Sequence, residues 1–218
     1  MNILYEDAEL LVCEKPAGLA TQTANVRETD LVSEIRKYLN NGYVGVIHRL
    51  DRPVAGLLVF AKTPAAAASL SKQVQTEDMG KTYLAFAEGR IGQTDDPVLL
   101  ENFLLHDRKR SVAVVVPDKE AANRKDCKRA RLTYRVLSYD ETEDVTKLEI
   151  RLQTGRFHQI RAQLSHIGHP VLGDVKYGAK KPAASKETAG IALFAYQLRF
   201  MHPVTGKEMF FQMSNSLL

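Results

Sequence analysis

The run of residues 56–61, Gly-Leu-Leu-Val-Phe-Ala, is the feature that most constrains the fold of this chain. A continuous apolar run of this length predicts a strand buried on both faces, inside a sheet that other elements cover. Charged residues precede it: Asp51 stands between Arg49 and Arg52, and His48 opens the segment. Nearby positive charge keeps a carboxylate ionised, and an ionised carboxylate can act as a nucleophile or a base. The two arginines can also bind a polyanion. The simpler interpretation is a β-turn with an Asp–Arg pair.

Other segments predict an α+β domain on a large, mostly antiparallel sheet. The acidic segment 140–144 lies between two alternating segments and predicts a hairpin. Residues 180–187 are expected to form a mobile loop. Helices are expected at 31–39 (capped by Asp30), from Pro64 (capped by Thr63) and at 158–167, and strands at 3–5, 10–13, 81–88, 132–137, 148–152 and 191–200.

Composition indicates a globular protein without a membrane or disulfide signal. The chain has 218 residues, 44% of them hydrophobic, and a formal net charge of +4, which permits a nucleic-acid partner without requiring one. The 2 cysteines fit neither zinc-ligand spacing nor a disulfide framework, and the N-terminus lacks a basic, apolar leader. We therefore expect a cytoplasmic protein.

The turn at residues 154–161, Thr-Gly-Arg-Phe-His-Gln-Ile-Arg, places cations at the start of a predicted helix. Arg156, His158 and Arg161 lie where the helix dipole is positive, so an anionic partner is expected there. That partner is either a phosphate or Asp51. Solvated arginines are the less favourable interpretation.

Two further segments offer nucleic-acid chemistry. Tyr83, in the predicted strand 81–88, is either a tyrosine at the rim of a sheet or a residue that stacks on a base or transfers a proton. The segment 124–131, which includes Lys128 and Arg129, is either a solvated face or a loop that contacts phosphates. Histidines 158, 166 and 169 have no acidic or cysteine partner at ligand spacing, so no metal site is expected.

A protein kinase is excluded, although its catalytic loop contains a similar His-Arg-Asp string. Here the order is His-Arg-Leu-Asp, no glycine-rich loop precedes it, and no Asp-Phe-Gly follows.

Taken together, these motifs resemble the RluA-type family of pseudouridine synthases, over residues 7–211. The resemblance implies a curved, mostly antiparallel mixed sheet flanked by helices, with an RNA-binding cleft, in a single domain 1–218 without an N-terminal S4 domain. The matching pieces are His48-Arg49-Leu50-Asp51 with Gly56-Leu57-Leu58, Lys81-Thr82-Tyr83-Leu84-Ala85, Thr154-Gly155-Arg156-Phe157-His158-Gln159-Ile160-Arg161, Gly168-His169-Pro170-Val171-Leu172-Gly173-Asp174, Leu193-Phe194-Ala195 and His202-Pro203.

The resemblance also implies residue roles. Asp51 would be the nucleophile at the target uridine, Tyr83 would pack on the flipped base, and Arg161 would pair with Asp51. Arg49 would enter the space that the uridine leaves, and Leu193 would wall the pocket. The implied partner is structured RNA, ribosomal or transfer, with no cofactor; a monomer is expected, although the sequence does not determine the oligomeric state. Residues His48, Arg52, Arg156, His158, Lys128 and Arg129 are further candidates for RNA contact.

Some positions depart from the family pattern. Val54-Ala55 replaces a common Thr-Ser, and Gln163 and Phe194 stand where histidines are common. These changes concern substrate detail more than the reaction. Two alternatives remain: a base-excising glycosidase, which generally needs a second carboxylate that these motifs lack, and an RNA-binding module without catalysis.

Overall fold

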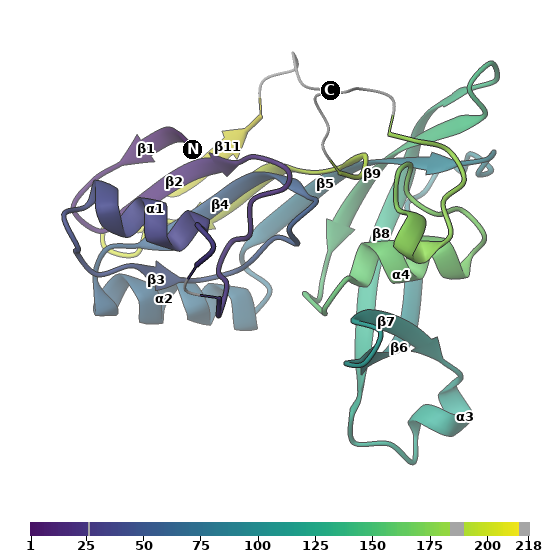
Figure 1. Cartoon of the computed structure of the whole chain (residues 1–218), viewed down its shortest axis with the longest axis horizontal. Helices are drawn as coiled ribbons and strands as arrows, with labels where there is room; N and C mark the ends of the chain where they lie inside the picture. Colours follow the sequence, from purple (N-terminus) through teal and green to yellow (C-terminus); the bar gives the residue numbers. More distant parts are fainter. Residues whose placement is uncertain (26, 184–189, 214–218) are drawn as a thin grey trace. The chain divides into compact units, whose positions relative to one another are not determined.

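The computed structural model describes residues 1–25, 27–183 and 190–213. The chain divides into two compact units, which are coloured along the sequence in Figure 1. The first comprises Met1–Thr82 and Phe194–Leu218, and the second comprises Tyr83–Leu193. Of the loop expected at 180–187, residues 184–187 lie outside the described residues.

The first unit is a mixed sheet with helices. Strand β4 is antiparallel to β2 and parallel to β10. All six residues from Gly56 to Ala61 are buried, as the apolar run predicts. Along the sheet the order is β1 (Asn2–Glu6), β2 (Leu10–Lys15), β4 (Ala55–Ala61) and β10 (Leu193–Met201), with β3 (Gly45–Val46) paired to β4 and β11 (Glu208–Gln212) paired to β10.

The helices of the first unit begin where the sequence predicts. Helix α1 (Leu31–Tyr38) is capped by Asp30, whose Oδ1 accepts a hydrogen bond from the Ser33 amide at 2.7 Å. Helix α2 (Pro64–Gln75) is capped by the Thr63 hydroxyl, and it packs against β3 and β4. Each cap satisfies a backbone donor that the first helical turn leaves unpaired.

The second unit is an antiparallel sheet with helix α4 packed against β6 and β7. The predicted hairpin around residues 140–144 is confirmed, because Asp140 pairs with Val145 across β8 and β9. The elements are β5 (Gly80–Glu88), β9 (Val145–Leu152), β8 (Cys127–Asp140), β6 (Val98–Asp107) and β7 (Val112–Val116) in sheet order, with α3 (Asp118–Ala121), α4 (Gln159–His166) and the 3-10 turn η1 (Val175–Tyr177).

The sequence does not predict β6, β7 or β11. The β6–β7 hairpin leaves apolar side chains outside, since Leu99 is 47% exposed and Val114 is 38% exposed. A strand whose apolar residues lie on both faces shows no clear alternation. Strand β8 is also longer than expected, because the basic residues from Lys128 onward continue its ladder with β6.

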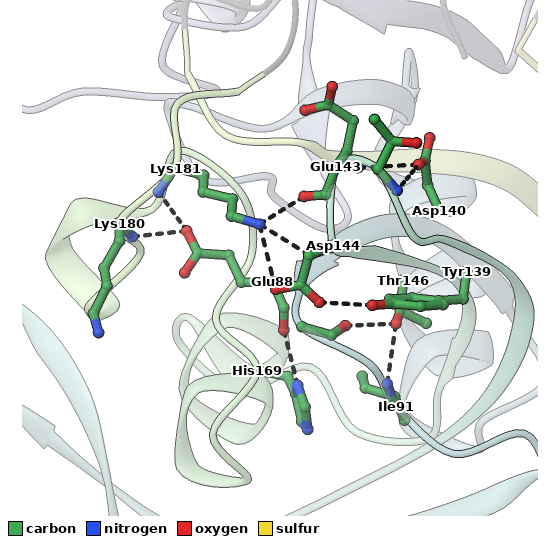
Figure 2. Close-up of polar contacts among 12 residues, drawn as sticks. Glu88, Ile91, Tyr139, Asp140, Glu143, Asp144, Thr146, His169, Lys180 and Lys181 are labelled. Atoms are coloured by element: carbon green, nitrogen blue, oxygen red, sulfur yellow. Dashed lines mark hydrogen bonds and ion pairs between the residues drawn. The ribbon is translucent and has the colours of Figure 1, made fainter.

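Polar contacts fix residues 180 and 181 to the end of β5 and residue 181 also to the turn between β8 and β9 (Figure 2). The Glu88 carboxylate accepts hydrogen bonds from the backbone amides of Lys180 (2.7 Å) and Lys181 (2.6 Å). The Lys181 ammonium donates to the carbonyls of Glu143 (2.6 Å) and Asp144 (3.2 Å). The loop after η1 is therefore tied to the end of β5 by the Glu88 side chain and to the hairpin by the Lys181 side chain. None of the described helices has the length and apolar character that crossing a membrane requires.

Candidate active site

The backbone on both sides of Asp51 is fixed by residues 15–21. The Thr21 hydroxyl donates to the Leu50 carbonyl at 2.9 Å and accepts from the Leu50 amide at 3.1 Å. The Arg52 carbonyl accepts from the Gly18 amide at 2.8 Å. Asp51 itself is half-buried, and its carbonyl accepts from the Val54 amide at 3.0 Å in a turn. The main chain that carries Asp51 is therefore anchored on both sides of this residue.

Lys15 is the most unusual of these anchors, because it is only 1% exposed. Its ammonium donates to the carbonyls of Pro16 (3.0 Å), Leu19 (2.7 Å) and Arg52 (3.1 Å). Burial lowers the pKa of Lys15 to about 8, and the nearby Asp51 charge opposes that decrease. A buried cation beside Asp51 favours the ionised form of this carboxylate.

Gly56 allows β4 to lie close to β10. Its φ is +134°, and a Cβ there would lie 2.4 Å from the Ala195 carbonyl oxygen and 2.6 Å from the Ala195 nitrogen. Phe194 pairs with Ala55 in the same register, and it is buried. Leu193 is also buried, at the start of β10. The glycine that follows the Asp51 loop is thus required by the backbone of the neighbouring strand.

The other charged residues of the motif have different surroundings. Arg49 is exposed. Arg52 forms an ion pair with Glu28 at the surface. The His48 Nε2 accepts from the Val59 amide at 3.3 Å, and burial, with a smaller contribution from Lys81, lowers the pKa of His48 to about 3. His48 is therefore neutral near pH 7. RNA contact by these three residues stays a prediction.

In the second unit, Arg161 has a partner that the sequence analysis did not identify. Its Nε and Nη2 donate to the two carboxylate oxygens of Asp174 at 2.6 and 2.8 Å. Arg161 is 4% exposed and Asp174 is 1% exposed. The guanidinium carbon also lies 4.9 Å from the ring centre of Tyr177. A bidentate pair fixes the plane of the guanidinium, so the orientation of Arg161 is set by Asp174.

The residues before α4 also take defined positions. His158 is the N-cap of α4 and has a left-handed backbone, with φ of 50°. Its Nδ1 lies 2.9 Å from the Tyr177 hydroxyl, which accepts a hydrogen bond from the Ala113 amide at 2.7 Å. Arg156 is exposed, and its Nε donates to the Arg129 carbonyl at 2.9 Å.

Of the remaining candidates, Tyr83 is buried in β5 at 7% exposure. Lys128 and Arg129 are exposed on β8, where Arg129 forms an ion pair with Glu101 of β6. Glu101 also pairs with Arg131, so part of the basic segment is neutralised by the neighbouring strand.

The side chain of Gln163, on α4, is fully buried. Its amide nitrogen donates to Asn102 Oδ1 at 2.8 Å and to the Leu100 carbonyl at 3.3 Å. This departure from the family pattern therefore keeps a polar group, which links α4 to β6.

Comparisons with known proteins identify the family. The model of the family described as RNA pseudouridylate synthase matches residues 9–166. The chain belongs to this family. It is 35% identical to an uncharacterized RNA pseudouridine synthase of Aquifex aeolicus, with 97% of this chain and 68% of the relative aligned. It is also 35% identical to the ribosomal large subunit pseudouridine synthase D of Vibrio vulnificus, with 97% of this chain and 66% of the relative aligned.

The chain thus spans about two thirds of the length of these two relatives. Its fold matches that of human RNA pseudouridylate synthase domain containing 1, with a TM-score of 0.77 at 23% identity over 100% of this chain and 84% of that one. The family resemblance and the α+β fold predicted from the motifs are confirmed, and the family consists of isomerases that act on RNA.

The sequence alone did not identify the residues that hold the Asp51 backbone and the Arg161 side chain in place. Lys15 and Thr21 lie in a segment to which the sequence assigns no role, and Asp174 ends the motif 168–174 without an expected role of its own. The unfavourable placement of arginines at a helix start correctly indicated an anionic partner for Arg161. It did not indicate Asp174, because this residue follows α4 in an irregular segment.

Proposed function

We propose that this chain converts specific uridines of structured ribosomal or transfer RNA to pseudouridine, with Asp51 as the nucleophile. The observation that carries the proposal is the anchoring of Asp51 on both sides, in a chain that belongs to the RNA pseudouridylate synthase family. Ribosomal RNA is favoured as substrate by the name of the Vibrio vulnificus relative.

Asp51 lies in the first unit, whereas Tyr83 and Arg161 lie in the second. In the proposed reaction Tyr83 packs on the base that leaves the stack, and Arg161 has the role that the family resemblance implies for it. Asp174 supports this role because it fixes the plane of the Arg161 guanidinium. Arg49, which is exposed, fills the space of the extruded nucleotide and offsets part of the unstacking cost of a few kcal/mol.

The chemistry needs no external group. The bond between C1′ and N1 breaks, the uracil rotates, C5 bonds to C1′, C5 loses its proton and N1 gains one. Every atom of the nucleoside is retained except for these exchanged protons. Attack of Asp51 at the sugar and attack at the base both satisfy this balance.

Replacement of Asp51 by Asn tests the nucleophile. The amide has the same shape but does not form the covalent intermediate, so pseudouridine formation should cease while RNA affinity stays within a few-fold. Asp95→Asn, at an exposed carboxylate outside the motifs, is the matched control. Product from the Asp51→Asn protein would refute the assignment. RNA binding without product from the unaltered protein would instead support a binding module.

A Tyr83→Phe change tests the tyrosine hydroxyl separately from its ring. Turnover should slow strongly if the hydroxyl takes part in proton transfer. An unchanged rate would leave only the ring in the mechanism. Mapping of pseudouridines in total RNA with and without this protein would identify the substrate.

A further inference from the structure

Three rings form a ladder at the surface of the second unit. The Phe157 ring centre lies 3.7 Å from that of His158, with 19° between the planes, and 4.0 Å from that of His106, with 32°. Two rings at such distances cannot share one face, so Phe157 lies between the two histidines. His106 is exposed and forms the outer end of the ladder, and Phe157 is itself 39% exposed.

The inner end of the ladder is held rigidly. The Tyr177 hydroxyl accepts a hydrogen bond from the Ala113 amide at 2.7 Å and forms a second hydrogen bond of 2.9 Å with Nδ1 of His158. Burial, with a smaller contribution from Arg161, lowers the pKa of His158 to about 3, so this ring is neutral near pH 7. The left-handed backbone of His158 costs conformational energy, which these contacts offset.

Cations border the exposed rings. The residues that follow β6 are Arg108, Lys109 and Arg110, all exposed, and they begin two positions after His106. Arg156 directly precedes Phe157 and is exposed too. Exposed planar rings bordered by cations are the combination found at sites for single-stranded nucleic acid, where bases stack and phosphates pair. A purely structural role would instead bury Phe157.

We propose that the outer face of His106, backed by Phe157 and His158, is a stacking site for an unpaired base of RNA, next to phosphate contacts from the turn 108–110. The identity of the ligand as RNA rests on the proposed function. The site itself consists of residues other than those proposed to carry the reaction.

The test uses the full chain and a short fluorescein-labelled oligoadenylate, compared with an abasic oligomer of the same length. His106→Leu keeps an apolar side chain over Phe157 but removes the planar surface. Affinity for oligoadenylate should fall about tenfold, the contribution of one stacked base, while affinity for the abasic oligomer and the salt dependence stay unchanged. His106→Phe should restore binding. His166→Leu, at an exposed histidine of α4, should bind as the unaltered protein does.

Three outcomes would overturn the site: unchanged affinity of the His106→Leu protein, equal losses for both oligomers, or no rescue by His106→Phe. If the His106→Leu protein fails to fold, the unaltered protein still decides the question, because 2-aminopurine within the oligomer should lose fluorescence on stacking. No loss on binding would refute the proposal. None of these measurements requires pseudouridine formation, so they separate this site from the proposed reaction.

Discussion

Replacement of Asp174 by Asn should destabilise the protein by about 3–5 kcal/mol. The substitution keeps volume and shape but removes the charge that accepts hydrogen bonds at 2.6 and 2.8 Å from Arg161, between side chains that are 4% and 1% exposed. The Asn oxygen can still accept one of these bonds, while its NH₂ group would face a guanidinium N–H, donor against donor. Loss of one charge-assisted bond (about 1.5–3 kcal/mol) and an unpaired buried donor (about 1–3 kcal/mol) add up to about 2.5–6 kcal/mol, a range that contains the about 3–5 kcal/mol lost when a buried ion pair is broken.

Urea unfolding near neutral pH measures this change, which is a large part of a typical stability of about 5–15 kcal/mol. Glu208→Gln is the matched control: it removes a 3.2 Å pair with Arg199 in which both side chains are more than half exposed, and it should change stability little. Pseudouridine formation by folded Asp174→Asn protein should also fall, because the Arg161 plane is no longer fixed. A destabilisation below about 1 kcal/mol would refute the reasoning.

Three further predictions concern the stability of the first unit. The pKa of Lys15 falls from 10.5 to about 8 on folding, so the buried charge lowers the stability of the folded protein below pH 8. As the pH rises from 8 to 10.5, the free energy of unfolding should therefore increase by up to about 3 kcal/mol. Denaturation at several pH values, with Lys15→Met as the reference, measures this increase. Gly56→Ala should cost about 3 kcal/mol or more through collision with Ala195, whereas Gly92→Ala, with open space at its Cβ, should change the melting temperature little. Burial alone would raise the pKa of Asp7, but hydrogen bonds led by two backbone amides lower it to about 2. In urea unfolding near pH 7, the Asp7→Asn protein should therefore be about 2 kcal/mol less stable than the unaltered protein. This difference in stability should shrink as the pH falls from 3.8 towards 2.

The sequence predicts those parts of the fold that local chemistry determines. Asp30 and Thr63 cap helices because their side chains reach amides three residues ahead. The hairpin at 140–144 follows from alternation on both sides of a polar turn. The β6–β7 hairpin could not be predicted in this way, because it packs against α4, which is distant in the sequence.

The candidate site shows the same division. The motif around Asp51 is continuous and can be recognised directly. Lys15 gives no such signal, since a lysine in a loop is normally exposed and only the fold shows that three carbonyls surround this one. Similarly, the dipole argument indicated an anion for Arg161, but sequence spacing cannot distinguish Asp174 from Asp51 or a phosphate.

The supports of Asp51 and Arg161 indicate how this chain positions its functional groups. Asp51 is held through contacts that Thr21, Gly18 and Lys15, all within the first unit, make with the backbone of the residues on either side of it. Arg161 is held by Asp174, within the second. Each unit therefore contains supports for its own functional group. Substitutions at these supports should consequently change stability and turnover together, whereas substitutions at exposed residues such as Arg49 should change turnover on RNA while leaving stability intact.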